Sequence, residues 1–233
     1  TRRGRQSQAL ILREAGVSFL MGLFSRPRAV EVTLKVVMPV APPEMLAQRK
    51  RTGADQWDEM WEGVLHVPPM PNYDHQDLEG ALEAYLRRRW AGPRKAKVLH
   101  QINLAPPGGW PEKNYRIPDL VLLTPERFDI NRSEYFEGAP DVVVEIHSPG
   151  DESYEKLPFY QELGVPEVWI IDRDTKAPEV YVLKRRRSKK QPADRAGWVR
   201  SPGTVIEMRA GRPGKLAIRL AGDEATREEL PAD

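Results

Sequence analysis

Two acidic residues interrupt segments that otherwise have the pattern of buried strands. Asp119 opens an apolar run directly after a proline, and Glu145 stands inside residues 141–148, the most apolar stretch of the chain. Side chains alternate between the two faces of a strand, so Glu145 and His147 share one face. An ionised carboxylate is costly to bury there unless a metal ion, another cation or a cleft compensates its charge. Asp119 and Glu145 are therefore the first candidates for chemistry.

A lysine on the next predicted helix supplies a cation for this pair. Lys156 follows Glu145 after a turn-rich connection, so its long side chain could point back toward the end of the strand. Two carboxylates and one ammonium group suit metal-assisted hydrolysis of a phosphate. The carboxylates hold a hard cation such as Mg²⁺, which polarises the phosphoryl oxygen and lowers the pKa of a bound water. The ammonium group orients that water or offsets the developing charge.

Hydrophobic periodicity and turn residues indicate the elements that must position these groups. Helices are predicted over residues 44–51, 74–89 and 151–163, and extended segments over 64–67, 97–104, 117–124, 141–148 and 167–172. Short apolar runs at 180–183, 198–200, 205–208 and 216–220 then predict a β-meander. The central part of the chain therefore combines strands with helices, and the C-terminal part is all strand.

The sequence predicts one folded domain with an extension at each end. At 233 residues the chain is long enough to close a hydrophobic core. Residues 1–28 superficially resemble a targeting peptide, but charges keep their apolar run well below the roughly 20 residues of a membrane span. We expect residues 1–40 to be a poorly ordered extension, residues 41–221 to be the domain, and residues 222–233 to be a loose tail.

Composition excludes several classes of protein. The chain has no cysteine, which rules out disulfide scaffolds, thiolate zinc sites and thiol nucleophiles. Lys and Arg number 36 against 34 Asp and Glu, a net charge of +2, so attraction to nucleic acid must come from local clusters. We expect a cytoplasmic protein without a membrane association. The oligomeric state stays open, with a homodimer among the options.

One such basic cluster lies between the predicted strands of the meander. Its members are Lys184, Arg185, Arg186, Arg187, Lys189 and Lys190. A solvated hairpin loop is one interpretation of this cluster. Contact with the phosphate backbone of DNA is the other, and it would give a salt-dependent affinity that is blind to sequence.

Four features, in order and with consistent spacing, resemble the Uma-type putative restriction endonuclease family of the PD-(D/E)XK nuclease superfamily. They are Pro118-Asp119, the Glu-Ile-His-Ser-Pro segment 145–149, the Lys-Leu-Pro-Phe-Tyr segment 156–160, and residues 164–172. The resemblance spans about residues 55–185. It implies an α/β (α+β) fold of the restriction endonuclease type, with a mixed central β-sheet flanked by helices. It also implies DNA as substrate and Mg²⁺ as cofactor, with Mn²⁺ able to substitute.

The same resemblance implies roles for individual residues. Asp119 and Glu145 correspond to metal ligands, and the backbone carbonyl of Ile146 is expected to add a third. The superfamily's catalytic lysine lies two residues after the glutamate, where this chain has His147. Uma-type members are similar in carrying a lysine on the following helix, so the role passes to Lys156. His147 is then either a proton shuttle or a structural hydrogen-bonding residue.

Two further positions resemble the family more weakly. His75 begins the predicted helix 74–89 at a position where the family often has histidine. Glu62 belongs to a Glu-Gly turn similar to the family's acidic-Gly turn. Family members carry another acidic residue after that glycine, and this chain has Val64 there. The resemblance therefore does not supply a third carboxylate ligand.

The leading hypothesis is a Mg²⁺-dependent DNA endonuclease in which water attacks the phosphorus directly, without a covalent intermediate. A nucleic-acid-binding protein that lacks catalysis on the same fold is the main alternative. A hydrolase of another phosphate or glycosidic substrate is a third option, because paired carboxylates alone do not name a substrate. Asp119 as the cap of a turn and Glu145 as the partner of an arginine are the structural alternatives.

Overall fold

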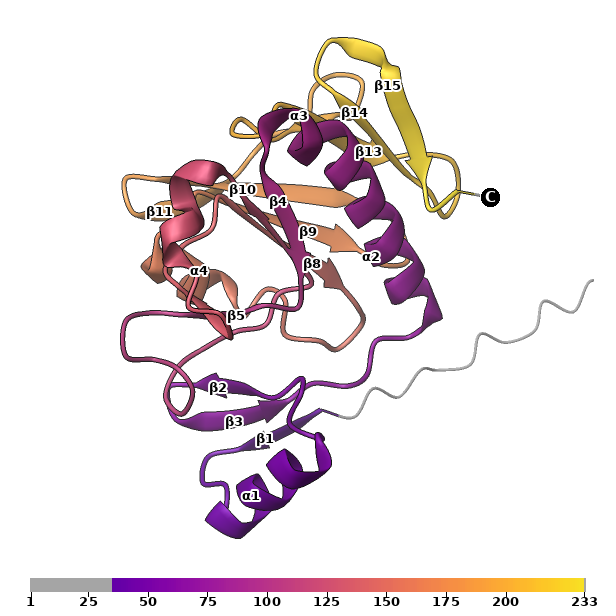
Figure 1. Cartoon of the computed structure of the whole chain (residues 1–233). Coiled ribbons are helices and arrows are strands. Elements are labelled where there is room, and N and C mark those ends of the chain that lie inside the picture. Colours follow the sequence, from indigo (N-terminus) through magenta and orange to yellow (C-terminus); the bar gives the residue numbers. More distant parts are fainter. Residues whose placement is uncertain (1–34, 233) are drawn as a thin grey trace, which may run out of the picture. The chain divides into compact units, whose positions relative to one another are not determined.

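A mixed six-stranded sheet forms the centre of the protein (Figure 1). The computed structural model describes residues 35–232. The strands are β4 (Lys97–His100), β6 (Leu120–Leu123), β8 (Val142–His147), β9 (Glu167–Asp172), β10 (Pro178–Lys184) and β11 (Arg187–Lys190), in the order β11-β10-β9-β8-β6-β4. Strands β8 and β9 pair in parallel, and all other neighbours in this sheet are antiparallel. The predicted mixed α+β architecture is confirmed.

Strand alternation divides the core into two layers. One layer contains Leu120, Val144 and Trp169 and packs against helix α2 (Tyr73–Leu86) and the C-terminal strands. The opposite layer contains Val143 and the buried residues of helix α4 (Leu157–Leu163). Because Glu145 is two residues beyond Val143, its side chain lies on the α4 side of the sheet.

Smaller sheets surround the central one. Strands β1 (Val36–Met38), β3 (Val64–Val67) and β2 (Glu59–Trp61) form an antiparallel sheet, and β5 (Asn103–Ala105) pairs in parallel with β7 (Tyr135–Glu137). The predicted meander forms the antiparallel sheet β12 (Val199–Arg200), β13 (Ile206–Ala210), β14 (Leu216–Leu220) and β15 (Asp223–Leu230). The remaining helical segments are α1 (Pro43–Thr52), a π-helical turn (Arg87–Ala91), α3 (Gly92–Arg94) and a 3₁₀ helix (Pro125–Ile130).

The structure corrects both predicted ends of the domain. Residues 223–230 form β15 instead of a loose tail, since Leu230 is buried in the core and Tyr85 donates a hydrogen bond to the carbonyl of Thr226. At the other end, β1 pairs with β3, so the folded part begins before residue 41. Residues 1–34 of the predicted extension lie outside the described part of the chain.

The helix predicted from residue 151 begins later, at Leu157. The Asp151 carboxylate accepts hydrogen bonds from the backbone N–H groups of Ser148 and Ser153, which holds the preceding residues in turns. The predicted extended segment 97–104 is likewise divided between β4 and β5. Within residues 35–232, none of the helices is both long enough and apolar enough to cross a membrane.

Candidate functional site

The antiparallel pairing of β6 with β8 brings Asp119 to the end of β8. Leu120 of β6 faces Val144 of β8, so the residue before β6 lies beside the last residues of β8. The Asp119 Oδ2 atom accepts a hydrogen bond of 2.6 Å from the backbone N–H of Ile146. Asp119 and Glu145 therefore lie together where two neighbouring inner strands of the central sheet end, although they are 26 positions apart in sequence. We call this end of the two strands the acidic edge.

Glu145 contacts the lysine that the sequence assigns to it. Its side chain is buried, and the Lys156 Nζ atom lies 3.2 Å from Oε2. The Tyr160 hydroxyl donates a hydrogen bond to Oε1. Lys156 directly precedes α4 and Tyr160 follows one turn later, so the beginning of this helix presents both groups to β8. Lys156 was predicted to lie on this helix; it is instead the residue directly before α4, and its side chain still reaches Glu145.

A second carboxylate, Glu59 of β2, also contacts Lys156. Its Oε1 atom lies 2.9 Å from the Lys156 Nζ atom and accepts a hydrogen bond of 2.8 Å from the backbone N–H of Ile117. Its Oε2 atom accepts a hydrogen bond from the Trp61 indole N–H. The ammonium group is therefore held between two buried carboxylates. Sequence reasoning missed Glu59 because β2 has only three residues and its partner is distant in sequence.

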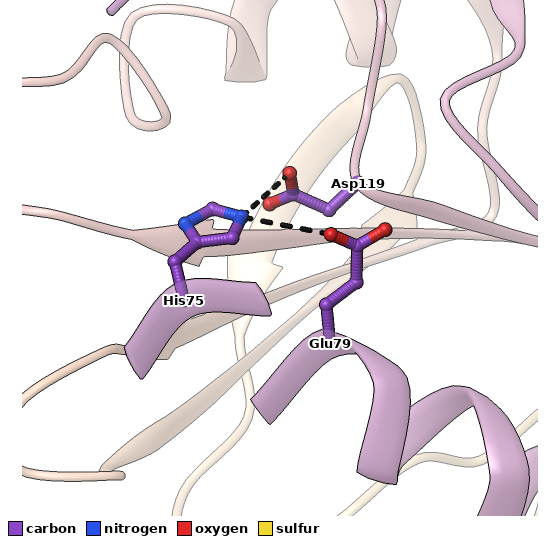
Figure 2. A group of neighbouring side chains, drawn as sticks. All are labelled: His75, Glu79 and Asp119. Atoms are coloured by element: carbon purple, nitrogen blue, oxygen red, sulfur yellow. Dashed lines mark hydrogen bonds and ion pairs between the residues drawn. The ribbon is translucent and has the colours of Figure 1, made fainter. Parts of the chain in front are cut away.

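On its other side, Asp119 faces a histidine and a glutamate of helix α2 (Figure 2). His75 Nε2 lies 3.0 Å from Asp119 Oδ1 and 3.9 Å from Glu79 Oε2. One ligand atom from each of these three residues lies within 4.8 Å of the other two. His75 and Glu79 are four residues apart, which places them on the same face of a helix. That spacing was the available signal for Glu79, which the sequence analysis did not select.

Burial and mutual repulsion shape the pKa values of these acids. Burial raises the pKa of Glu145 to about 8, with Asp119 and Glu59 adding to the shift and Lys156 opposing it. Burial and Asp119 raise the pKa of Glu79 to about 7. Burial also raises the pKa of Asp119, but His75 and the Ile146 N–H outweigh it and hold that pKa below its ordinary value. The acidic edge thus holds more carboxylates than the nearby cationic groups, Lys156 and His75, can neutralise.

Comparisons with known proteins show the family to which this chain belongs. The family model described as Uma2, putative restriction endonuclease, matches residues 43–213. This chain belongs to the Uma2 family. The crystal structure of a putative nuclease belonging to DUF820 from Anabaena variabilis ATCC 29413 is similar, with a TM-score of 0.51 and 19% sequence identity. The match covers 63% of this chain and 82% of that one. No curated protein matches the chain.

Two predicted site residues of the Uma2 chain, His147 and Glu62, contact residues other than Asp119 and Glu145 in the described part of the chain. His147 Nδ1 is 2.7 Å from Asp151 Oδ1, in the turn that follows β8. Glu62 is exposed in the turn between β2 and β3, where its backbone N–H contacts the Asn114 side chain. These contacts favour the structural interpretation of His147. They do not bring either side chain to Asp119.

The basic cluster of the Uma2 chain lies on the β10–β11 hairpin, at the opposite end of the sheet from Asp119. Strand β10 begins beside the end of β9 and runs back along it. The turn that connects β10 to β11, at Arg185 and Arg186, therefore lies beyond the start of β9. Glu179 of β10 pairs with the same β9 residue as Glu145, Ile170. The hairpin turn is six residues farther on, roughly 20 Å away at the rise of a strand. The cluster is therefore a separate surface from the acidic edge.

Without metal, the Uma2 chain is expected to lose stability as the pH rises from about 5 to 8.5. The pKa values of Glu79, Glu145 and His75 are all raised, so the folded protein holds protons that the unfolded chain has released. Folding stability falls with pH wherever the folded state binds more protons. A pKa raised by one corresponds to about 1.4 kcal/mol, so the expected decrease is on the order of 5 kcal/mol. Urea unfolding in EDTA at several pH values measures it, and stability that is flat or rises over this range contradicts the assignment.

Proposed function

We propose that this chain is a Mg²⁺-dependent endonuclease that hydrolyses phosphodiester bonds of DNA, with Mn²⁺ able to replace Mg²⁺. Its family is described by nuclease activity, and the single observation that carries the proposal is the arrangement at the edge of the sheet. Asp119 and Glu145 lie beside each other, and the Lys156 ammonium group contacts Glu145 at 3.2 Å. This is the donor set that metal-assisted phosphate hydrolysis requires.

The residues present fit a hard divalent cation. Asp119 and Glu145 offer carboxylate oxygens, the ligands that Mg²⁺ prefers. The N–H of Ile146 points toward Asp119, and the N–H and C=O of one residue point to the same side of an antiparallel pair. The Ile146 carbonyl can therefore join the two carboxylates. A cation bound there polarises the scissile phosphate and lowers the pKa of a water.

The surrounding side chains keep the reacting groups in place. Lys156 is charged throughout the neutral range, because Glu145 and Glu59 raise its pKa although burial alone would lower it. Its ammonium group can orient the attacking water and offset negative charge on the phosphate. Tyr160 and Glu59 restrict Glu145 and Lys156 by direct hydrogen bonds, and His75 does the same for Asp119. Prealigned groups of this kind lower a barrier without reorganising during the reaction.

The substrate class is tested by incubating the protein with supercoiled, linear and single-stranded DNA in Mg²⁺, Mn²⁺ or EDTA. We expect cleavage with either cation and none in EDTA. A small phosphodiester, bis-p-nitrophenyl phosphate, is included in parallel. Turnover of that ester with every DNA substrate left intact would replace DNA with a small phosphate ester as the substrate.

A second candidate, DNA binding without hydrolysis, is favoured by the exposed hairpin and by His147 at the superfamily's lysine position. Lys184, Arg185, Arg187 and Lys189 are exposed, and no ion pair is formed by them within residues 35–232. This candidate predicts tight, metal-independent DNA binding and no cleavage by the wild-type chain. Cleavage that requires Glu145 excludes it.

Neutralising the hairpin should weaken DNA binding and leave the chemical step unchanged. We expect a variant with Lys184, Arg185, Arg187 and Lys189 replaced by glutamine to show a shallower dependence of log Kd on log salt concentration. Each lost phosphate contact lowers that slope by about 0.9 for duplex DNA. Fluorescence anisotropy over a salt series measures it, with Lys50→Gln/Arg51→Gln at the end of α1 as the control. An unchanged slope removes the hairpin from the DNA interface.

Two broader expectations accompany the proposal. We propose a cytoplasmic location, where chromosomal and foreign DNA are accessible, and we retain a homodimer as the assembly that would cut both strands of a duplex. Light scattering of the purified protein, with and without DNA, distinguishes a dimer from a monomer.

A further inference from the structure

A cavity lies close to Asp119, between the segment that precedes β2, the middle of helix α2 and the end of β4. Its volume is about 280 Å³. Two of its lining residues connect it to Asp119. The backbone N–H of Gln101 donates a hydrogen bond of 3.1 Å to the Asp119 carbonyl, and a Glu79 carboxylate oxygen lies within 4.8 Å of an Asp119 carboxylate oxygen. A ligand in this cavity would therefore lie beside the proposed site of phosphate hydrolysis.

The helical wall of the cavity contains a glycine in the middle of α2. Gly80 lines the cavity, although glycine destabilises the interior of a helix relative to alanine. Close packing often explains such a residue. Here a Cβ atom added to Gly80 would have no side chain or neighbouring segment within 4 Å in the described part of the chain. Packing does not require the glycine, and its effect is to leave the cavity open along the helix.

Another wall is an aromatic ring without a partner. Within residues 35–232, each of the other five tryptophans donates an indole hydrogen bond, stacks on another ring or faces a guanidinium group. The half-buried Trp57 makes none of these contacts and lines the cavity. Met70, beside it in the lining, is 70% exposed. The cavity thus offers an aromatic and apolar surface on which a planar ring can stack.

The polar part of the lining suits a neutral ligand with a hydrogen-bonding edge. Gln76 and Gln101 contribute amide groups, which both donate and accept, and Glu79 and Glu83 contribute carboxylates. Among the described residues that line the cavity, none is a lysine or an arginine, so a phosphate group would be repelled. The volume is just below the range of about 300–1,000 Å³ that is usual for drug-sized ligands. It suits one nucleobase better than a base pair.

We propose that this cavity binds one unpaired nucleobase of the DNA strand, next to the phosphate that Asp119 serves. The base would stack on Trp57, with its edge toward the amides of Gln76 and Gln101. Aromatic stacking and amide contacts are the usual means of holding an unpaired base. A base inside a duplex must first leave the stack to reach such a pocket. This inference rests on the proposed function and adds to it a preference for single-stranded or unpaired DNA.

The first test follows the indole N–H signals of the ¹⁵N-labelled full chain by NMR, without DNA or cleavage. The Trp57 signal is identified by its absence from Trp57→Phe. We expect it to shift with deoxyadenosine and deoxycytidine, but not with deoxyribose 5-phosphate, which lacks a base. Gly80→Leu should abolish the shift, because its side chain fills the cavity, and it should fold because that space is open. Ala84→Leu, exposed one turn farther along α2, is the control and should retain the shift.

The second test measures the binding of fluorescein-labelled single-stranded and duplex oligonucleotides in EDTA by fluorescence anisotropy. Loss of one base stack should raise the Kd of Trp57→Leu for the single strand by about tenfold and change the Kd for duplex DNA little. Trp57→Phe keeps an aromatic ring and should bind nearly as well as the wild type. Tyr73→Ala removes an aromatic residue that is 79% exposed but lies outside the cavity lining, and it should change neither Kd.

The outcomes separate this inference from the proposed function. A Trp57 signal that does not shift with either nucleoside, or that shifts equally with deoxyribose 5-phosphate, overturns the inference. Equal single-strand binding by Trp57→Leu and the wild type does the same. Cleavage of single-stranded DNA by Gly80→Leu at the wild-type rate overturns the inference and leaves the proposed nuclease standing. Nucleoside binding at Trp57 by a chain that cuts no DNA supports the cavity and contradicts the proposed hydrolysis.

Discussion

Glu145→Gln is expected to lose DNA cleavage by about a thousandfold or more while folding at least as stably as the wild type in EDTA. Loss of a metal ligand removes several kcal/mol of transition-state stabilisation, and each 1.4 kcal/mol corresponds to about tenfold in rate. The stability of the metal-free protein should not fall, because glutamine removes one of two buried charges that compete for Lys156. Single-turnover cleavage rates and urea unfolding of the same preparation measure both effects.

Loss of cleavage without loss of stability distinguishes a catalytic role of Glu145 from a structural one. If Glu145 only held Lys156 in a structural ion pair, its replacement would destabilise the fold and any loss of cleavage would follow from unfolding. Glu137→Gln, on β7 and paired with Arg132 at the surface, is a control of equal charge. Cleavage by Glu145→Gln within a few-fold of the wild-type rate would remove Glu145 from the site.

Lys156→Met is expected to destabilise the protein by about 3 kcal/mol or more at pH 8. Removing one member of a buried ion pair leaves the other charge uncompensated, and here two carboxylates, Glu59 and Glu145, lose their common partner. The loss should be smaller at pH 5.5, where protonation of Glu145 relieves the repulsion. Lys184→Met, on the exposed part of β10, is the control and should leave stability unchanged.

A double variant gives this prediction an internal check. Glu145→Gln added to Lys156→Met should restore part of the lost stability, since it removes one of the two unpaired charges. The coupling energy of a double-mutant cycle reports that interaction directly. Additive effects of the two substitutions would mean that Lys156 and Glu145 are not energetically paired, contrary to their 3.2 Å contact.

The central strands and the candidate pair Asp119 and Glu145 were predictable because local patterns encode them. Alternation along 141–148 placed Glu145 on the same face as Val143, and the structure confirms this face through the two core layers. The family resemblance rested on short segments in a fixed order, and the family match confirms it. Lys156 was selected from its position after the turn, and its contact with Glu145 agrees with that choice.

The remaining members of the site depend on contacts that no local pattern encodes. Glu59 reaches Lys156 through a three-residue strand that periodicity is too short to reveal. Glu79 lies among the core-facing residues of α2, where the neighbouring leucines dominate the pattern. The strand β15 was missed because its outward face is charged, while the burial of Leu230 becomes evident only after β14 is placed.

The most direct test of the central claim is a supercoiled-plasmid assay with purified wild-type protein and Glu145→Gln side by side in Mg²⁺. The account predicts nicked or linear plasmid with the wild type, no product in EDTA, and intact supercoiled plasmid with the variant. Equal product from both proteins, or product that persists in EDTA, would contradict a metal site at Asp119 and Glu145. An intact plasmid with both proteins, although DNA is bound, would contradict nuclease activity and favour the binding function.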